Sequence, residues 1–240
     1  MVDPKWNIAN APNGGYLVSI ALRAIEQTLP HPDPFAVTAH FPTRTDTGDV
    51  VVEVEPTRRG RTHSTAAARL VQGDETRVVV VATYGDLGEI RGPTVVRDGP
   101  PSFPDPEECV PAVGPFAPVF VKQFDLRLTP DTAAWATTRP SGTAEMSGWT
   151  RFADGRDADT RSLILFADSF PPAIFNVATA LWVPTLELTV HVRGRPSPGW
   201  LQCRFQTRYL INGYLEEDGE IWDSTGRLVA LSRQLARIHT

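Results

Sequence analysis

NGGYLVSIALRAIEQTL, residues 13–29, predicts a long helix that is buried on most of its sides. Nearly every side chain between 16 and 25 is apolar, and a helix that is apolar around most of its circumference must be covered by other chain segments. Pro30 and Pro32 end the helix. Its polar side chains fall on one stripe, formed by Ser19, Arg23, Glu26 and Gln27.

Strands are predicted directly after this helix, at residues 36–41, 50–56, 64–72 and 77–84. Gly-Asp pairs at 48–49 and 73–74 mark turns between them. One long helix followed by an antiparallel meander must wrap the sheet around the helix to bury it. This arrangement is the hotdog fold.

The same order of elements recurs about 150 residues later, with faint sequence similarity. The segment Thr-Ala-His-Phe at 38–41 resembles Thr-Val-His-Val at 189–192. Gly48 matches Gly199, and the closing segments 77–84 and 227–234 also align. Because the matches keep one register, they predict a duplicated unit.

The second copy is predicted to have a helix near 160–169 and strands near 185–194, 199–210, 213–223 and 227–238, with additional strands near 120–128 and 144–152. The stretch 86–118 is rich in Pro, Gly and Asp, which break helices and central strands. We therefore expect an α+β double hotdog with its sheets joined side by side. Its parts are an N-terminal unit at 1–85, a linker at 86–118 and a C-terminal unit at 119–240.

Composition excludes several classes of function. The chain has 240 residues, 41% of them hydrophobic, and a net charge of -5, so we expect no nucleic-acid partner. The start, MVDPKWNIANAPNGG, has no secretion signal, and no apolar stretch is long enough to span a bilayer. Cys109 and Cys203 stand alone and far apart. This pattern predicts a cytoplasmic protein without disulfide, metal or cofactor.

Asp168 is a candidate for acid–base chemistry. It follows Ile164 and Leu165 on one apolar helix row and precedes Pro171, near the negative end of the helix dipole. Desolvation and that dipole would both raise the pKa of the carboxyl, which suits a general base near neutral pH. The alternative is that Asp168 caps the turn that follows.

Gln234 lies on the last predicted strand, with small neighbours on the same face that leave room for a pocket around its amide. It could equally be an exposed edge residue. In the sequence repeat, Tyr84 is the equivalent of Gln234 and Val18 is the equivalent of Asp168, so the first unit lacks both polar groups. This difference predicts one site for each pair of units. His40 and His191 occupy equivalent places, which the duplication explains better than a metal pair does.

Short motifs connect the candidates to a known family. They are Asn13-Gly14-Gly15 at the helix start, Gly60-Arg61-Thr62-His63-Ser64-Thr65 entering a strand, Asp168 within LFADSF, Thr185 before a strand with Glu187, and LVALSRQ ending at Gln234. Together they resemble the TesB-like (thioesterase II) acyl-CoA thioesterases over almost the whole chain. Two features depart from that family: Glu187-Leu188 replaces its Asp-His pair, and Pro171-Pro172 rewrites the helix after Asp168.

The resemblance implies an enzyme that hydrolyses an acyl thioester, carried by CoA or by an acyl carrier protein, without a covalent intermediate. Asp168 would accept a proton from a water molecule that Thr185 and Gln234 hold against the thioester carbonyl. Thr189 is the rival of Thr185 for the hydroxyl role. Similar proteins also suggest a homodimer.

Two turns are candidates for substrate binding. The backbone of Asn13, Gly14 and Gly15 could stabilise an oxyanion. Arg59, Gly60 and Arg61 could hold the phosphates of CoA, because arginine binds phosphate well, or could form a solvated turn.

Two other functions stay open. A hotdog dehydratase or hydratase would share the fold, although such enzymes pair a histidine with the carboxylate and no histidine stands beside Asp168 in the sequence. A non-catalytic acyl-CoA-binding protein would keep the pocket without turnover.

Overall fold

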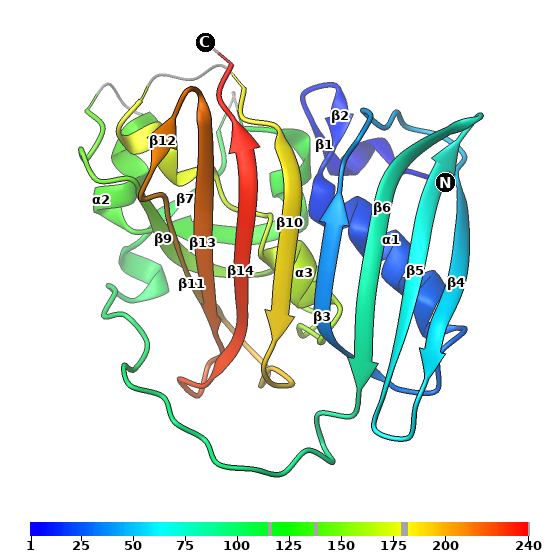
Figure 1. The fold of residues 1–240 in the computed structure, drawn as a ribbon. Helices are drawn as coiled ribbons and strands as arrows, with labels where there is room; N and C mark the ends of the chain where they lie inside the picture. Colours follow the sequence, from blue (N-terminus) through cyan, green and yellow to red (C-terminus); the bar gives the residue numbers. More distant parts are fainter. Residues whose placement is uncertain (115–116, 137–138, 179–181, 240) are drawn as a thin grey trace.

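The computed structural model describes residues 1–114, 117–136, 139–178 and 182–239. In this part of the chain, one 12-stranded antiparallel sheet runs in the order β4-β5-β6-β3-β10-β14-β13-β11-β9-β8-β7, with β12 paired to β13 (Figure 1). The first half contributes β3 (Asp33–His40), β4 (Val51–Arg59), β5 (His63–Gln72) and β6 (Glu75–Gly85). The second half contributes β7 (Val110–Pro111), β8 (Phe124–Leu128), β9 (Glu145–Phe152), β10 (Thr185–Val192), β11 (Leu201–Gln206), β12 (Leu210–Ile211), β13 (Tyr214–Trp222) and β14 (Leu228–Arg237). A small separate sheet pairs β1 (Asn7–Ile8) with β2 (Ala11–Pro12).

Helix α1 (Gly14–Glu26) lies across the inner face of β4, β5 and β6, as the apolar pattern predicts (Figure 1). Asn13 caps its start by accepting a hydrogen bond from the backbone N–H of Tyr16 at 2.9 Å. The helix ends before the predicted Leu29, because the N–H groups of Thr28 and Leu29 both turn back to the carbonyl of Ile25. The double hotdog fold is thereby confirmed in its first half.

The two halves join where β3 pairs with β10. Thr38 lies directly opposite Thr189, and their hydroxyl oxygens are 2.9 Å apart. These are the two residues that the sequence repeat aligns with each other. An approximate twofold axis therefore passes between them, and the joined sheets are confirmed.

The register of the closing strands differs from the one that the sequence predicts. Thr38 pairs with Val81 on β6, whereas Thr189 pairs with Arg233 on β14. The same ladder places Ala82, rather than Tyr84, at the position equivalent to Gln234. The two registers differ because the hairpin turn between β5 and β6 is short, whereas the equivalent turn between β13 and β14 is longer.

The described residues of the second half form no long helix. We expected one at 160–169, but α3 covers only Ser162–Phe166. Ser169 bonds back to the carbonyl of Phe166 through both its N–H and its hydroxyl, and Pro171-Pro172 cannot continue a helix. A short 3-10 helix, η5 (Ala173–Asn176), follows instead.

The predicted linker, 86–118, is only partly a linker. Its later residues form the 3-10 helix η2 (Pro106–Glu108) and strand β7, which pairs with β8. The indole N–H of Trp149 also donates to the carbonyl of Pro104 at 2.9 Å. Proline breaks regular structure but tolerates an edge strand, which is the place of Pro111 in β7.

A buried carboxylate links the halves at the end of the sheet away from the start of α1. Asp33 is 4% exposed and accepts hydrogen bonds from the guanidinium of Arg195, at 2.7 Å for the shortest, and from the hydroxyl of Thr160 at 3.1 Å. Arg195 also reaches Asp86 at 2.9 Å. The ion pair therefore connects β3 to the turn after β10.

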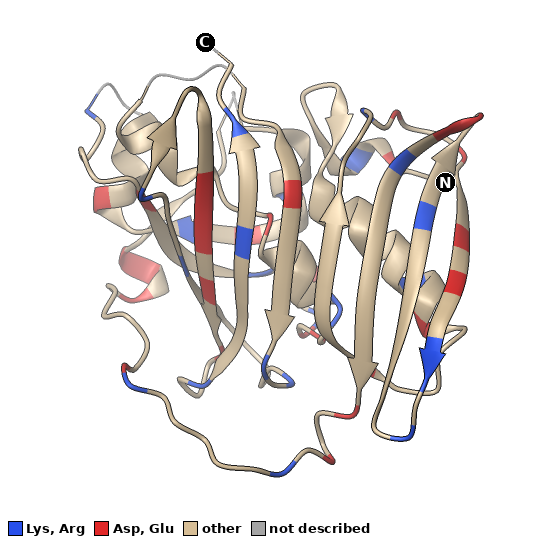
Figure 2. Ribbon diagram, viewed as in Figure 1, with Lys and Arg blue, Asp and Glu red and all other residues tan. Residues whose placement is uncertain are grey.

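Charged side chains on β13 and β14 lie mainly on the outer face of the sheet. Figure 2 shows acidic positions along β13 beside basic positions on β14, and Asp218 pairs with Arg233 at 2.6 Å across these strands. The inner face carries the apolar core. No helix within the described ranges is long and apolar enough to cross a membrane.

Candidate active site

Asp168 lies just after α3, against the first turn of α1. Its Oδ2 accepts hydrogen bonds from the backbone N–H of Gly15 at 2.7 Å and from the side-chain Nδ2 of Asn13 at 2.9 Å. Asn13 is fully buried and also donates to the backbone carbonyl of Asp168 at 2.7 Å. The N-cap residue of one helix thus fixes the carboxylate that follows the other.

Glycine at position 15 allows this close approach. A Cβ there would lie 2.9 Å from the Cβ of Asp168 and 3.0 Å from the carbonyl oxygen of Ile164. Ordinary Cβ contacts are longer, so any side chain would push α1 and α3 apart.

The pKa of Asp168 is raised from 3.8 to about 6. Desolvation is the main cause, and the bonds from Gly15, Asn13 and Gly14 act in the opposite direction. The sequence argument was right about desolvation, and the structure adds the start of α1 to the helix end on which Asp168 lies. Asp168 faces the positive end of α1, which lowers its pKa rather than raising it.

Residues 13–15 surround the Asp168 carboxylate. Gly15 N–H and Asn13 Nδ2 bond to Asp168 and so are not free to hold a substrate oxyanion. Gly14 packs beside them, where a Cβ would lie 3.0 Å from Phe41 Cζ. The glycine-rich turn therefore holds the Asp168 carboxylate, and its role in binding the substrate stays a prediction.

Thr185 and Gln234 meet on the inner face of the sheet. The Thr185 hydroxyl donates to Gln234 Oε1 at 2.8 Å. A β-bulge makes this possible: the register shifts between Thr185 and Glu187, so Leu186 is an extra residue on β10. A bulge reverses which face the following side chains use, and Thr185 therefore pairs with Ala236 on the inner face.

Thr189 lies on the opposite face. It pairs with the outward-facing Arg233 and bonds to Thr38 at 2.9 Å and to Glu187 at 2.5 Å. The geometry brings Thr185, and not Thr189, to Gln234.

Glu217 is part of this cluster, although the sequence argument missed it. Gln234 Nε2 donates to Glu217 Oε1 at 2.8 Å, and the N–H of Ala173 donates to Glu217 Oε2 at 2.6 Å. The pKa of Glu217 is raised from 4.5 to about 7, mainly by desolvation and further by the charge of Asp168. The signal was present: Glu217 shares a strand face with the apolar Leu215 and Ile221.

The first half has no such cluster. By strand register, Pro34 stands in place of Thr185, Ala82 in place of Gln234 and Ala66 in place of Glu217. The sheet therefore folds equally well with apolar residues at all three positions. Only the second half carries the polar set, in keeping with one site for each chain.

The turn with Arg59, Gly60 and Arg61 lies apart from this cluster. It joins β4 to β5 at the end of the sheet where α1 finishes, and Arg59 reaches the carbonyl of Thr28 at 3.2 Å (Figure 1). Asp168 lies beside the start of α1, whereas the arginine turn lies beside its end. The 13 residues of α1, at about 1.5 Å each, separate them by about 20 Å. Both arginines are exposed.

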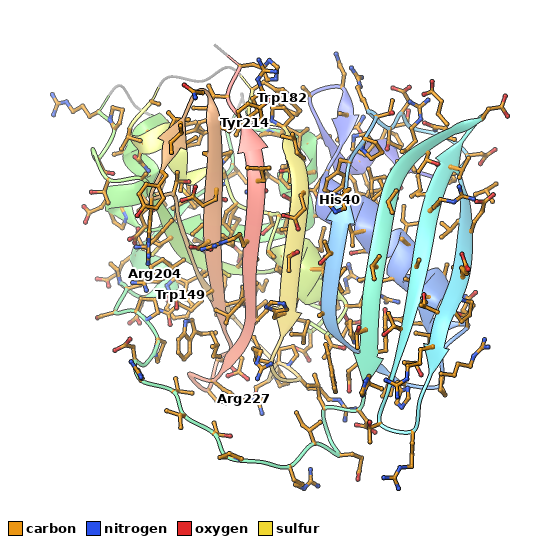
Figure 3. The ribbon with its side chains drawn as sticks, in the orientation of Figure 1. His40, Trp149, Trp182, Arg204, Tyr214 and Arg227 are labelled. Atoms are coloured by element: carbon orange, nitrogen blue, oxygen red, sulfur yellow. The ribbon has the colours of Figure 1, made fainter. Side chains whose placement is uncertain are left out.

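Histidines lie away from Asp168. Figure 3 shows His40 near the end of β3, where it pairs with Glu187 of β10. His31 contacts Ser64 and the Arg61 carbonyl, and no histidine hydrogen-bonds to Asp168 in the described part of the chain. The described residues also contain no group of three His, Cys, Asp or Glu that could hold a metal ion.

The fold and cluster together define a double hotdog protein whose second half carries a carboxylate, a hydroxyl and an amide, those of Asp168, Thr185 and Gln234. Residues 2–85 match the family model of the acyl-CoA thioesterase N-terminal domain, and residues 100–238 match that of the acyl-CoA thioesterase C-terminal domain. The chain belongs to this family, in its TesB-like (thioesterase II) branch, and is a thioester hydrolase.

Relatives agree with this assignment. A structure from Thermobifida fusca, assigned as a thioesterase II, is 31% identical with a TM-score of 0.92 and covers 99% of this chain and 90% of its own. An acyl-CoA thioesterase II from Mycobacterium marinum shares the fold at a TM-score of 0.73 and 19% identity, covering 94% of this chain and 88% of its own. An uncharacterized protein of Mycobacterium tuberculosis is 27% identical over 99% of this chain and 89% of its own length.

Proposed function

We propose that this protein hydrolyses acyl-CoA thioesters with a water molecule that Asp168 activates. The observation that carries the proposal is the Asp168 carboxylate. It is held rigidly through Oδ2 by Gly15 and Asn13, and its pKa is raised to about 6. A base with that pKa is ionised at neutral pH and still basic enough to accept a proton.

In the proposed reaction, Oδ1 of Asp168 accepts a proton from water as the water oxygen attacks the thioester carbonyl carbon. Thr185, positioned by Gln234, accepts the second hydrogen of that water and so orients its lone pair. The tetrahedral intermediate then collapses, the C–S bond breaks, and the sulfur leaves as a thiolate that takes up a proton. The products are a free carboxylic acid and a thiol.

A hotdog dehydratase or hydratase is the second candidate. The absence of a histidine hydrogen bond to Asp168 among the described residues favours hydrolysis over it. The third candidate is an acyl-CoA-binding protein without turnover. The raised pKa of Asp168 favours catalysis, because a binding site gains nothing from a poised base.

A panel of acyl-CoA esters from short to long chains, with matched acyl carrier protein thioesters, tests the proposal through thiol release with Ellman's reagent. We propose a reduced, cytoplasmic setting for the protein, and its own thiols should contribute little signal. Cys109 and Cys203 are both buried, and burial raises the pKa of each thiol. Tight binding of acyl-CoA without thiol release would favour the binding protein, and loss or addition of water on a hydroxyacyl or enoyl ester would favour the dehydratase.

A further inference from the structure

Glu217 is a buried carboxylate that the proposed reaction does not use. It is 5% exposed, and hydrogen-bond donors occupy both of its oxygens: Gln234 Nε2 at Oε1 and the Ala173 N–H at Oε2. No cation pairs with it among the described residues. Burying an unpaired carboxylate is costly, so its presence calls for a reason.

The fold itself does not supply that reason. The equivalent position in the first half is Ala66, which is fully buried in the same sheet environment. Glu217 occurs together with Gln234 and Thr185 in the second half, and all three are replaced by apolar residues in the first half. This shared distribution connects Glu217 with the site rather than with folding.

An ionised Glu217 dictates the direction of a hydrogen-bond chain. A carboxylate only accepts, so Gln234 must turn its NH₂ toward Glu217 and its Oε1 toward Thr185. Thr185 must then donate its only proton to Gln234. Its oxygen is left with lone pairs alone, which can accept a hydrogen from water but cannot donate one.

We propose that Glu217 is a positioning residue that sets the direction of the chain Glu217–Gln234–Thr185, so that its charge state decides whether Thr185 accepts a hydrogen from the attacking water or donates one to it. The proposal rests on the proposed function. The accepting form of Thr185 holds the second hydrogen of the water and leaves both lone pairs of its oxygen available for the attack, whereas a hydrogen donated by Thr185 would occupy one of them.

Protonation reverses the chain. The Ala173 N–H is a fixed donor, so the proton of a neutral Glu217 goes to the oxygen that faces Gln234. Gln234 must then flip, present Oε1 to Glu217 and donate from its NH₂ to Thr185. As pH rises and Glu217 loses its proton, the hydrogen-bond chain therefore changes from the reversed to the productive direction, and this change is the switch.

Burial of Glu217, and to a lesser degree the charge of Asp168, raises its pKa and places this switch near neutral pH. Asp168 is the one charged group acting on it among the described residues, and it disfavours ionisation. Glu216 and Asp218, its neighbours on β13, lie on the outer face, where Asp218 pairs with Arg233. The pKa of Glu217 is about 7, above that of Asp168 at about 6.

Glu217→Gln tests the proposal, because it copies the protonated state. Its carbonyl serves the Ala173 N–H and its NH₂ faces Gln234, which locks the reversed direction at every pH. We expect kcat to fall on the order of ten- to a hundredfold with KM little changed. The wild-type kcat should rise with pH through two ionisations, and that of the variant through one. The matched control is Glu216→Gln, one residue away on the outer face, which should keep the wild-type profile. A Glu217→Gln enzyme with wild-type kcat and both ionisations would overturn the proposal.

A second measurement does not depend on activity. The side-chain amide resonances of Gln234, followed by NMR in ¹⁵N-glutamine-labelled wild-type protein and assigned by loss in Gln234→Ala, should shift as the pH rises from about 5 to about 9. Unmoved resonances in the folded protein would contradict the switch even if the enzyme is active. Wild-type protein that shows the shift but releases no thiol would refute the proposed function and leave the switch standing.

Discussion

Asp168 combines two opposing influences on a single carboxyl group. Burial against α1 and α3 raises its pKa, while Gly15 and Asn13 donate to it and lower the pKa. Desolvation is the larger effect, so the group is poised near pH 6 and yet held in one orientation. The turn of Asn13–Gly15 therefore fixes the orientation of the Asp168 carboxylate.

Substitution of Gly15 tests that role. Gly15→Ala places a Cβ 2.9 Å from the Cβ of Asp168, so the helices must separate and the bond to Oδ2 must lengthen. We expect a loss of about 1–3 kcal/mol in the free energy of unfolding, together with lower kcat. Urea denaturation and thiol-release kinetics measure the two effects. Gly99→Ala is the control, since a Cβ there meets nothing within 4 Å. Equal behaviour of the two variants would remove Gly15 from the support of Asp168.

The two threonines of β10 form a natural pair of variants. Thr185→Ala removes the hydroxyl bonded to Gln234 and should lower kcat by on the order of ten- to a thousandfold. Thr189→Ala removes a hydroxyl on the outer face and should leave kcat within about twofold of wild type. Steady-state kinetics on one acyl-CoA decide the matter, and the reverse ranking would show that the bulge does not direct Thr185 into the site.

At the residue scale, the sequence predicted Asp168, Thr185 and Gln234 as the catalytic residues and kept Thr189 as the rival of Thr185. The two threonines are four residues apart, so a regular strand would place both on the same face. Only the extra residue Leu186 turns Thr185 to the inner face. A bulge leaves no local sequence mark. Glu217 was missed for the opposite reason, since its inward position was readable from the alternation of β13 but had no family motif attached.

Among the elements, α1 was readable from sequence because its apolar pattern extends over several turns, whereas α3 was not. The short α3 ends at Phe166, and the chain bends at Pro171-Pro172 into η5. That bend brings the N–H of Ala173 to Glu217, five residues beyond Asp168. The loss of a regular helix thus carries both carboxylates into one site.

The turn between β4 and β5 retains its predicted role in binding CoA phosphates. Arg59→Ala combined with Arg61→Ala should raise KM for an acyl-CoA by several-fold and leave kcat unchanged, because the turn lies about 20 Å from Asp168. The matching acyl-pantetheine thioester lacks the nucleotide and should show no change in KM. An unchanged KM for the CoA ester as well would make this a solvated turn.

For the whole molecule, the repeat in the sequence predicted the joined sheet, and the Thr38–Thr189 pair lies on its approximate twofold axis. The lengths of hairpin turns were not predictable from a faint repeat, so the equivalence of Gln234 with Tyr84 was wrong. The division into units at 85 and 119 stays a prediction. The duplication explains how one half can specialise in catalysis while the other keeps apolar residues.

One consequence concerns assembly. Asp168, Thr185, Gln234 and Glu217 all belong to one chain, so the monomer should be the minimal active species. We propose a homodimer, in which a second copy covers part of the sheet surface, including exposed side chains such as Val81 at 48%. Sedimentation combined with activity across dilution tests this view, and we expect activity per chain to stay constant as the dimer dissociates. Activity that collapses on dissociation would mean that the site spans two chains.

The pH dependence of kcat/KM for wild type and Asp168→Asn, measured by thiol release from about pH 4.5 to about pH 9, tests the general-base claim most directly. Asp168 must be ionised to accept a proton, so wild-type kcat/KM should rise as pH passes through about 6. Asp168→Asn keeps the shape of the side chain but cannot accept the proton, and we expect it to be more than about a hundredfold slower without that ionisation. Near wild-type turnover by Asp168→Asn would contradict the assignment of Asp168 as the base.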